Sequence, residues 1–219
     1  MGSNVNIAIV DYGMGNIHSV QRALRYAAPE ANVYLANTVQ LLDQADKVVL
    51  PGQGAMKDCM LNLERSGLKE SLLIAAKNKP LLGVCVGEQM LFERSDEGNA
   101  ECLGLFPGYV AKFEGEVFAK PHLNDHREHL KVPHMGWSQV KQERSHPIWN
   151  GIPDNSFFYF VHSYYVVPSE PSLTVGSSLY GYPFTCAVAK DNIFAAQFHP
   201  EKSAEYGLKL YRNFVEWKI

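Results

Sequence analysis

The sequence predicts an α/β fold with a mostly parallel central sheet flanked by helices, extended in the second half by antiparallel or mixed β structure. Apolar runs alternate with stretches of helical periodicity over residues 6–94, whereas short β-rich runs dominate the remainder. Strands separated by helices of this length form βαβ units, which bury a parallel sheet on both faces. With 219 residues and no composition break, the chain is predicted to be one domain spanning 1–219.

The first half divides into alternating elements. The apolar runs predict strands at 6–10, 33–35, 47–50 and 81–84. Helical periodicity predicts helices at 17–28, 56–63, 68–76 and 88–94. A glycine-rich turn at 11–16 and the segment Pro-Gly-Gln-Gly at 51–54 each follow a strand.

The second half is richer in β-strand signals. Short runs predict strands at 109–113, 138–141, 157–161, 174–179, 184–189 and 193–197. Asp191-Asn192 predicts a hairpin turn between the last two. A final helix at 204–217 carries its apolar residues on neighbouring stripes.

Composition narrows the class of protein. The chain is 46% hydrophobic and 20% charged, with a formal net charge of -3, so nothing in its charge favours nucleic acid or a membrane surface as partner. The N-terminus has no positive region followed by an apolar stretch, and no segment is long and apolar enough to span a membrane. Four scattered cysteines form no C-x-x-C pair, which predicts neither disulfides nor a zinc ribbon. We therefore expect a cytoplasmic enzyme.

Cys85 is the strongest functional signal. It lies in Gly-Val-Cys-Val-Gly at 83–87, between an apolar strand and a predicted helix. This pattern is typical of a nucleophile elbow, a turn so sharp that flanking side chains would clash. The positive partial charge of a helix N-terminus would favour the thiolate.

A base and an acid follow near the C-terminus, in Gln-Phe-His-Pro-Glu at 197–201. Imidazole can take the proton of a cysteine and return it to a leaving group near neutral pH. A carboxylate two residues away can fix the imidazole tautomer and stabilise imidazolium. Together with the elbow, His199 and Glu201 predict a Cys-His-Glu triad.

These motifs resemble those of the class I glutamine amidotransferases, which hydrolyse glutamine to glutamate and ammonia. Four further segments, at 12–16, 51–54, 133–137 and 159–164, resemble the glutaminase subunits of imidazole glycerol phosphate synthase in histidine biosynthesis. The resemblance covers nearly the whole chain and implies a flavodoxin-like fold. It implies no cofactor and no metal. It also implies a heterodimer with a cyclase subunit of (β/α)8-barrel type, which receives the ammonia to form imidazole glycerol phosphate and aminoimidazole carboxamide ribonucleotide.

The same resemblance assigns roles beyond the triad. It places oxyanion donors at the backbone of Val86 and in the loop containing Gly52 and Gln53, where the family commonly has Val at position 53. It implies that the glutamine site is contacted by Gln89, His162, Ser163 and Tyr164. It implies that the partner is contacted by Asn16, Met135, Trp137 and Lys202, with Tyr164 beside them. Glu88 stands where the family commonly has Met.

Other interpretations are weaker. Gly13-x-Gly15 lacks the third glycine and the acidic residue of a dinucleotide fingerprint. The histidine-rich segment 121–129 fits no zinc spacing and predicts a polar surface loop of unassigned role. An amidotransferase subunit serving another acceptor, such as a sugar-modifying synthase, is the main alternative. A non-catalytic regulatory subunit on the same fold and a cysteine hydrolase are further ones.

Overall fold

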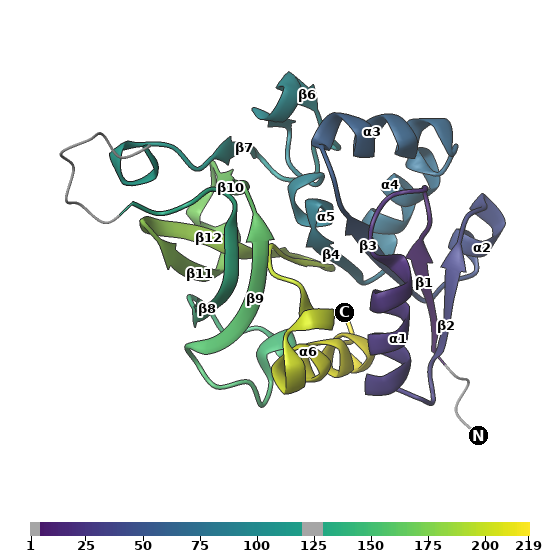
Figure 1. Ribbon diagram of the computed structural model, residues 1–219. Coiled ribbons are helices and arrows are strands. Elements are labelled where there is room, and N and C mark those ends of the chain that lie inside the picture. The colour runs from purple at the N-terminus through teal and green to yellow at the C-terminus, as the bar shows by residue number, and fades with distance from the viewer. Residues whose placement is uncertain (1–4, 120–128) are drawn as a thin grey trace.

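Five parallel strands form the centre of the molecule, in the order β2-β1-β3-β4-β13 (Figure 1). The structure is a computed structural model that describes residues 5–119 and 129–219. The strands are β1 (Asn6–Val10), β2 (Asn32–Ala36), β3 (Lys47–Gly52), β4 (Leu81–Cys85) and β13 (Ile193–Ala196). All residues of β3, β4 and β13 are buried, as a parallel sheet covered on both faces requires. This strand order is that of flavodoxin-like sheets, so the predicted fold class is confirmed.

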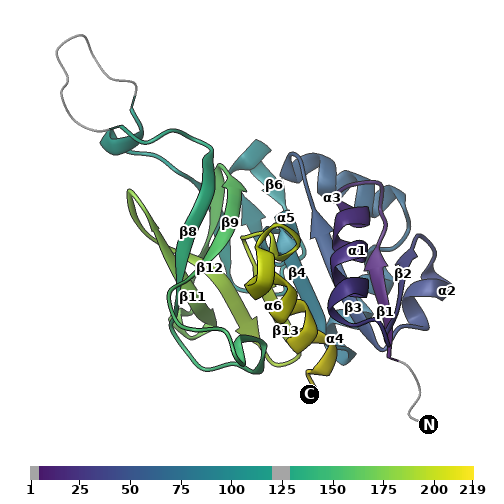
Figure 2. The same cartoon turned by 60° about the horizontal axis from the view of Figure 1, so that its bottom comes forward.

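Helices cover both faces of this sheet. They are α1 (Ile17–Ala27), α2 (Val39–Asp43), α3 (Met56–Arg65), α4 (Lys69–Asn78) and α6 (Ala204–Glu216). In Figure 2, α1 and α6 lie together in front of the sheet, whereas α3 and α4 lie behind it. From β1 the chain moves to β2 at the edge of the sheet, and then returns past β1 to β3. Because crossovers between parallel strands are right-handed, this reversal places α1 on one face of the sheet and the helices that follow on the other. Among the described residues, no helix has the length and apolar character needed to cross a membrane.

The second half extends the sheet with mostly antiparallel pairs. β12 (Tyr182–Lys190) pairs with β13, and the sheet continues through β10 (Tyr164–Pro168), β7 (Gly108–Lys112), β5 (Arg94–Ser95) and β6 (Ala100–Glu101). A branch runs from β12 through β11 (Thr174–Tyr180) and β8 (His134–Gln142) to β9 (Ser156–His162). Four short 3-10 helices lie between these strands: η1 (Glu97–Asn99), η2 (Glu116–Phe118), η3 (Pro147–Trp149) and η4 (Pro171–Leu173). A fifth, η5 (Pro200–Lys202), lies between β13 and α6. The antiparallel extension is therefore confirmed, and so is the hairpin turn at 191–192.

The predicted helix at 88–94 is wrong. α5 (Val86–Gln89) is a single turn, because the chain then makes tight turns and is drawn into the sheet. Glu93 accepts a hydrogen bond from the backbone N–H of Gly108, and Arg94 pairs with Tyr109 of β7. Four elements were also missed: α2, the short strands β5 and β6, and β10. β8 begins four residues earlier than predicted, at His134.

The elbow packs on β3 through backbone-to-backbone contact. A Cβ atom on Gly87 would lie 1.9 Å from the carbonyl oxygen of Leu50, and one on Gly52 would lie 2.7 Å from the Gly87 nitrogen. On the other side, a Cβ on Gly83 would lie 2.8 Å from the Cβ of Ala195. Only glycine fits at these positions, which confirms the steric interpretation of the motif. The packing fixes the end of β3 against the turn that carries Cys85.

We predict that Gly87→Ala destabilises the protein by about 3 kcal/mol or more, because the added methyl overlaps a backbone oxygen that cannot rotate away. Gly104→Ala is the matched control. Its φ is +64° and no atom lies within 4 Å of the added Cβ, so we expect a cost of only about 1 kcal/mol. Urea unfolding of both variants gives the comparison, and equal costs would contradict the contact described here.

Candidate active site

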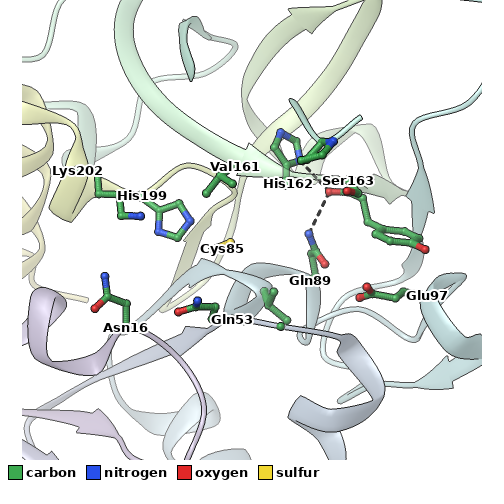
Figure 3. A pocket seen from close by; sticks show the side chains of 14 residues that line it. Asn16, Gln53, Cys85, Gln89, Glu97, Val161, His162, Ser163, His199 and Lys202 are labelled. Carbon is green, nitrogen blue, oxygen red and sulfur yellow. Dashed lines mark hydrogen bonds between the residues drawn. The ribbon is translucent and has the colours of Figure 1, made fainter. Parts of the chain in front are cut away.

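A cavity of about 280 Å³ lies at the carboxyl ends of the central strands, where open α/β sheets bind their ligands. It is lined by most of the predicted site residues, including the nucleophile and the base (Figure 3). The predicted residues that line it are Asn16, Gln53, Cys85, Val86, Gln89, His162, Ser163, Tyr164, His199 and Lys202. Gly54, Glu97, Pro133 and Val161 complete the wall.

Cys85 occupies a strained turn at the tip of β4. Its φ of 56° lies in the left-handed region, which a residue with a side chain adopts only where its surroundings impose it. The residue is 6% exposed and faces the cavity. Gln197, from the segment after β13, donates to Sγ through Nε2 at 3.8 Å. The elbow thus presents a nearly buried nucleophile to a small cavity.

The structure brings His199 and Glu201 together beside it. His199 Nδ1 donates to Glu201 Oε1 at 2.8 Å, and the backbone N–H of His199 donates to the carbonyl of Tyr159 at 2.9 Å. The other ring nitrogen, Nε2, is buried, has no hydrogen-bond partner among the described residues, and points toward Cys85 (Figure 3). Tyr211 on α6 approaches Glu201 Oε2 through its hydroxyl at 3.4 Å.

The electrostatics of His199 suit an acid–base role. Burial alone would lower its pKa, but the charges of Cys85 and Glu201, together with the Glu201 hydrogen bond, outweigh it and raise the pKa of His199 to about 10. The imidazolium is therefore the stable form at neutral pH when Cys85 is a thiolate. This pairing is typical of cysteine nucleophiles activated by histidine.

The loop after β3 lies directly against the elbow. Gly52 is paired in register with Cys85, and Val86 is the first residue of α5. The Tyr12 hydroxyl donates to the Pro51 carbonyl at 2.9 Å, and Cys59 Sγ donates to the Gln53 carbonyl at 3.3 Å. The predicted oxyanion residues therefore lie beside the nucleophile, and two side chains fix the carbonyls of their loop.

The opposite wall carries the predicted glutamine contacts and one residue that the sequence did not single out. Gln89, Ser163 and Tyr164 face the cavity together with Glu97 (Figure 3). Glu97 is held by the backbone N–H of Met56, which donates to its Oε2 at 2.8 Å. Glu97 lies in the polar segment Asp-Glu-Gly-Asn at 96–99, which looks like an ordinary turn, so no sequence signal distinguishes it.

His162 belongs to a buried pair with His134. His134 Nδ1 and His162 Nε2 lie 2.9 Å apart, and His162 Nδ1 donates to the Tyr164 carbonyl at 2.8 Å. Burial lowers the pKa of His134 to about 4 and that of His162 to about 3. Both nitrogens of His162 are engaged, so it lines the cavity without forming a catalytic pair with Ser163.

The four residues predicted to contact a partner line the cavity or lie on the exposed surface of β8. Met135 and Trp137 project from β8 and are 63% and 50% exposed. The Trp137 ring packs edge-on against Tyr159, and Lys202 Nζ lies 5.5 Å from the centre of the Tyr159 ring. Asn16 precedes α1 and, like Lys202, lines the cavity. The assignment of these residues to an interface stays a prediction.

Glu88 is fully buried behind the elbow. Neither carboxyl oxygen has a hydrogen-bond partner among the described residues. Burial, and in second place the charge of Cys85, raise its pKa well above the ordinary value. The surroundings of Glu88 therefore favour its uncharged form.

The histidine-rich segment falls largely outside the described residues, which include only His129 of its histidines. Within the described part of the chain, no group of three or more His, Cys, Asp or Glu side chains could hold a metal ion. All four cysteines are free thiols, and three of them, Cys59, Cys85 and Cys186, are buried.

Comparison with known proteins agrees with this geometry. The family model described as "Glutamine amidotransferase class-I" matches residues 8–217. "Imidazole glycerol phosphate synthase subunit HisH" of Dechloromonas aromatica is 56% identical over 97% of this chain and 96% of its own length. The protein of the same name from Nitrosomonas europaea is 53% identical over 97% and 98%.

Solved structures share the fold at lower identity. A structure of PurLQS from Thermotoga maritima superposes with a TM-score of 0.72 at 17% identity, covering 97% of this chain and 98% of that one. A glutamine amidotransferase from the same organism gives 0.60 at 17% identity, covering 94% and 80%. With the family model spanning nearly the whole chain and relatives above 50% identity, the chain belongs to the class I glutamine amidotransferases.

Proposed function

We propose that this chain is the glutamine-hydrolysing subunit of an imidazole glycerol phosphate synthase and that Cys85, His199 and Glu201 perform the hydrolysis. One observation carries the catalytic part: Cys85 and His199 line one cavity, Glu201 holds the far nitrogen of His199, and the opposite wall of the cavity offers a carboxylate and an amide. The full-length relatives named HisH support the choice of synthase. A cytoplasmic location and a single domain remain predictions.

The reaction begins with attack of the Cys85 thiolate on the side-chain amide carbon of glutamine. A C–S bond forms, and the carbonyl oxygen becomes an oxyanion. In this proposal the backbone N–H of Val86 donates to it, as the residue after the nucleophile does in other nucleophile elbows. The loop at Gly52 and Gln53, which packs on the elbow, supplies the second donor in this proposal.

His199 then acts as the acid and afterwards as the base. Its Nε2 proton passes to the departing nitrogen, the C–N bond breaks, and ammonia leaves behind a γ-glutamyl thioester. Water attacks the thioester while His199 accepts its proton. The C–S bond breaks, glutamate is released, and the thiolate and imidazolium are restored. Glu201 holds the Nδ1–H and stabilises the charged ring throughout.

Glutamine itself is recognised at the far wall. Its α-ammonium requires an anionic partner, and Glu97 is the only carboxylate among the described residues that line the cavity. Gln89 and Ser163 supply polar contacts beside it. The cavity has a volume of only about 280 Å³, so it suits a single amino acid better than a peptide.

The ammonia passes, in this proposal, to a cyclase subunit of (β/α)8-barrel type, which joins it to a phosphoribulosyl aminoimidazole-carboxamide nucleotide. The exposed aromatic and methionine side chains at Met135 and Trp137 are of the kind enriched in protein interfaces. Asn16 and Lys202 contact the partner at the cavity mouth. An amidotransferase serving a different acceptor would keep the same triad, so co-purification of the partner and identification of its substrate decide between them.

Cys85→Ala removes the nucleophile, and we predict loss of glutamine hydrolysis to the background level. The assay measures glutamate release by the chain alone, with the cyclase, and with the cyclase plus nucleotide. We expect little activity from the chain alone and strong activity in the full mixture. Retained turnover by Cys85→Ala in the full mixture would refute the mechanism.

Glu97→Gln is expected to raise KM for glutamine about tenfold or more, because a charge-assisted contact to the ammonium is lost. The side-chain oxygen that remains in this variant can still accept a hydrogen bond from the Met56 N–H, so the local fold is kept. Glu101→Gln, at an exposed carboxylate of β6, is the matched control and should leave KM unchanged. A KM equal to that of the control would exclude Glu97 from substrate binding.

Glu201→Gln is expected to lower kcat by about 100-fold or more. It should also move the alkaline limb of the pH profile toward neutral pH. The sign follows from charge: Glu201 helps raise the pKa of His199, so its neutralisation lets the imidazolium lose its proton at lower pH. Glutamate release measured from about pH 6 to about pH 10.5 tests this, since the range spans both limbs. An unmoved alkaline limb would contradict it.

A further inference from the structure

We propose that Gln197 is a further catalytic residue, whose amide nitrogen donates a hydrogen bond to the Cys85 thiolate in a direction fixed by the backbone carbonyl of Tyr164. The proposal deepens the proposed hydrolysis and rests on the role of Cys85 as nucleophile. The Gln197 side chain is fully buried, and Gln197 precedes the proposed base, His199, by two residues in the sequence.

The direction of each hydrogen bond follows from one group that can only accept. The Tyr164 carbonyl lies 3.1 Å from one atom of the Gln89 amide, so that atom must be the nitrogen, Nε2. The same Nε2 lies 2.7 Å from the Gln197 amide, whose facing atom must therefore be the oxygen. Gln197 is then left with its NH2 group toward Cys85 Sγ, at 3.8 Å.

This orientation does not depend on how amide oxygen and nitrogen are assigned, because a backbone carbonyl has no alternative. Reversing Gln89 would place its oxygen against the Tyr164 oxygen. Reversing Gln197 would place two NH2 groups together and an oxygen against the sulfur. The backbone N–H of Gln197 also donates to the Cys186 carbonyl at 2.9 Å, which holds the residue in register.

A second series of hydrogen bonds meets at the same carbonyl. His162 must donate through Nδ1 to Tyr164, so its Nε2 accepts from His134 Nδ1 when both rings are neutral. The remaining nitrogen, His134 Nε2, then accepts from the Ser138 hydroxyl at 2.9 Å. The Tyr164 carbonyl thus receives two donors and is held between two buried networks, which prevents it from turning away from Gln89.

A donor beside the sulfur matters because Cys85 is nearly buried, with 6% of its surface exposed. Among the described residues, the charge of Cys85 acts on the pKa values of Tyr12, Cys59, Glu88 and His199, and of these four His199 is the one that can be cationic. A neutral N–H donor adds stabilisation of the anion without a second positive charge. It also restrains the sulfur from its buried side, because Gln197 is fully buried and is not among the described residues that line the cavity.

The test is the pH profile of Cys85 alkylation by iodoacetamide, followed by peptide mass spectrometry, in the chain without glutamine or partner. In Gln197→Met, we expect the midpoint to move up by about one pH unit, so the rate below the midpoint falls about tenfold. Gln197→Glu keeps an acceptor for Gln89 but cannot donate when ionised, and we expect a shift at least as large. Gln142→Met is the matched control: its amide donates to the Ile152 carbonyl far from the sulfur, and its profile should equal wild type.

Wild-type midpoints in both Gln197 variants, with native circular dichroism, would overturn the proposal. Should Gln197→Met fail to fold, Gln89→Met decides. It leaves Gln197 in place but frees its amide to rotate, so the midpoint should rise by a smaller amount, and an unchanged midpoint overturns the proposal. Alkylation needs no glutamine turnover. A shifted midpoint in a chain that lacks glutaminase activity would therefore refute the proposed function but support the role of Gln197.

Discussion

Backbone contact between the elbow and the end of β3 is the constraint on which the site depends. With no Cβ at Gly52 or Gly87, the carbonyl of Leu50 reaches the turn that carries Cys85. The contact joins the loop at Gly52 and Gln53, the proposed oxyanion loop, to the turn that carries Cys85, at the carboxyl edge of a sheet buried on both faces. The strained φ of Cys85 persists because neighbouring strands on both sides leave the turn no room to relax.

The remaining groups of the site are organised around hydrogen-bond direction. His199 is fixed by Glu201 on one nitrogen, which leaves the other for the sulfur and the leaving group. The Tyr164 carbonyl likewise fixes the hydrogen-bond direction of the Gln89 and Gln197 amides and of the His162 and His134 imidazoles. In both cases an obligatory acceptor determines which atom of a polar side chain faces the reaction.

The sequence supports the central part of this picture because its signals are local. Buried parallel strands read as apolar runs, the elbow requires its glycines, and His199 and Glu201 are close neighbours in the chain. The failures have a different origin. The helix predicted at 88–94 is overridden by pairing with β7, a contact between segments that the local pattern does not reveal. Glu97 and Tyr211 join the site only through tertiary packing. Tyr211 lies in the final helix, and because a buried tyrosine hydroxyl needs a hydrogen-bond partner, its burial is a usable signal of such a contact.

The buried histidines also change how the molecule carries charge. Burial lowers the pKa values of His134, His146 and His162 to about 4, 4 and 3, whereas that of His199 is raised to about 10. These four of the eight histidines therefore keep a constant charge across the range in which histidine normally titrates. These four residues therefore add little buffering capacity near neutrality. Mild acidification of its surroundings leaves the electrostatic field around the nucleophile largely unchanged.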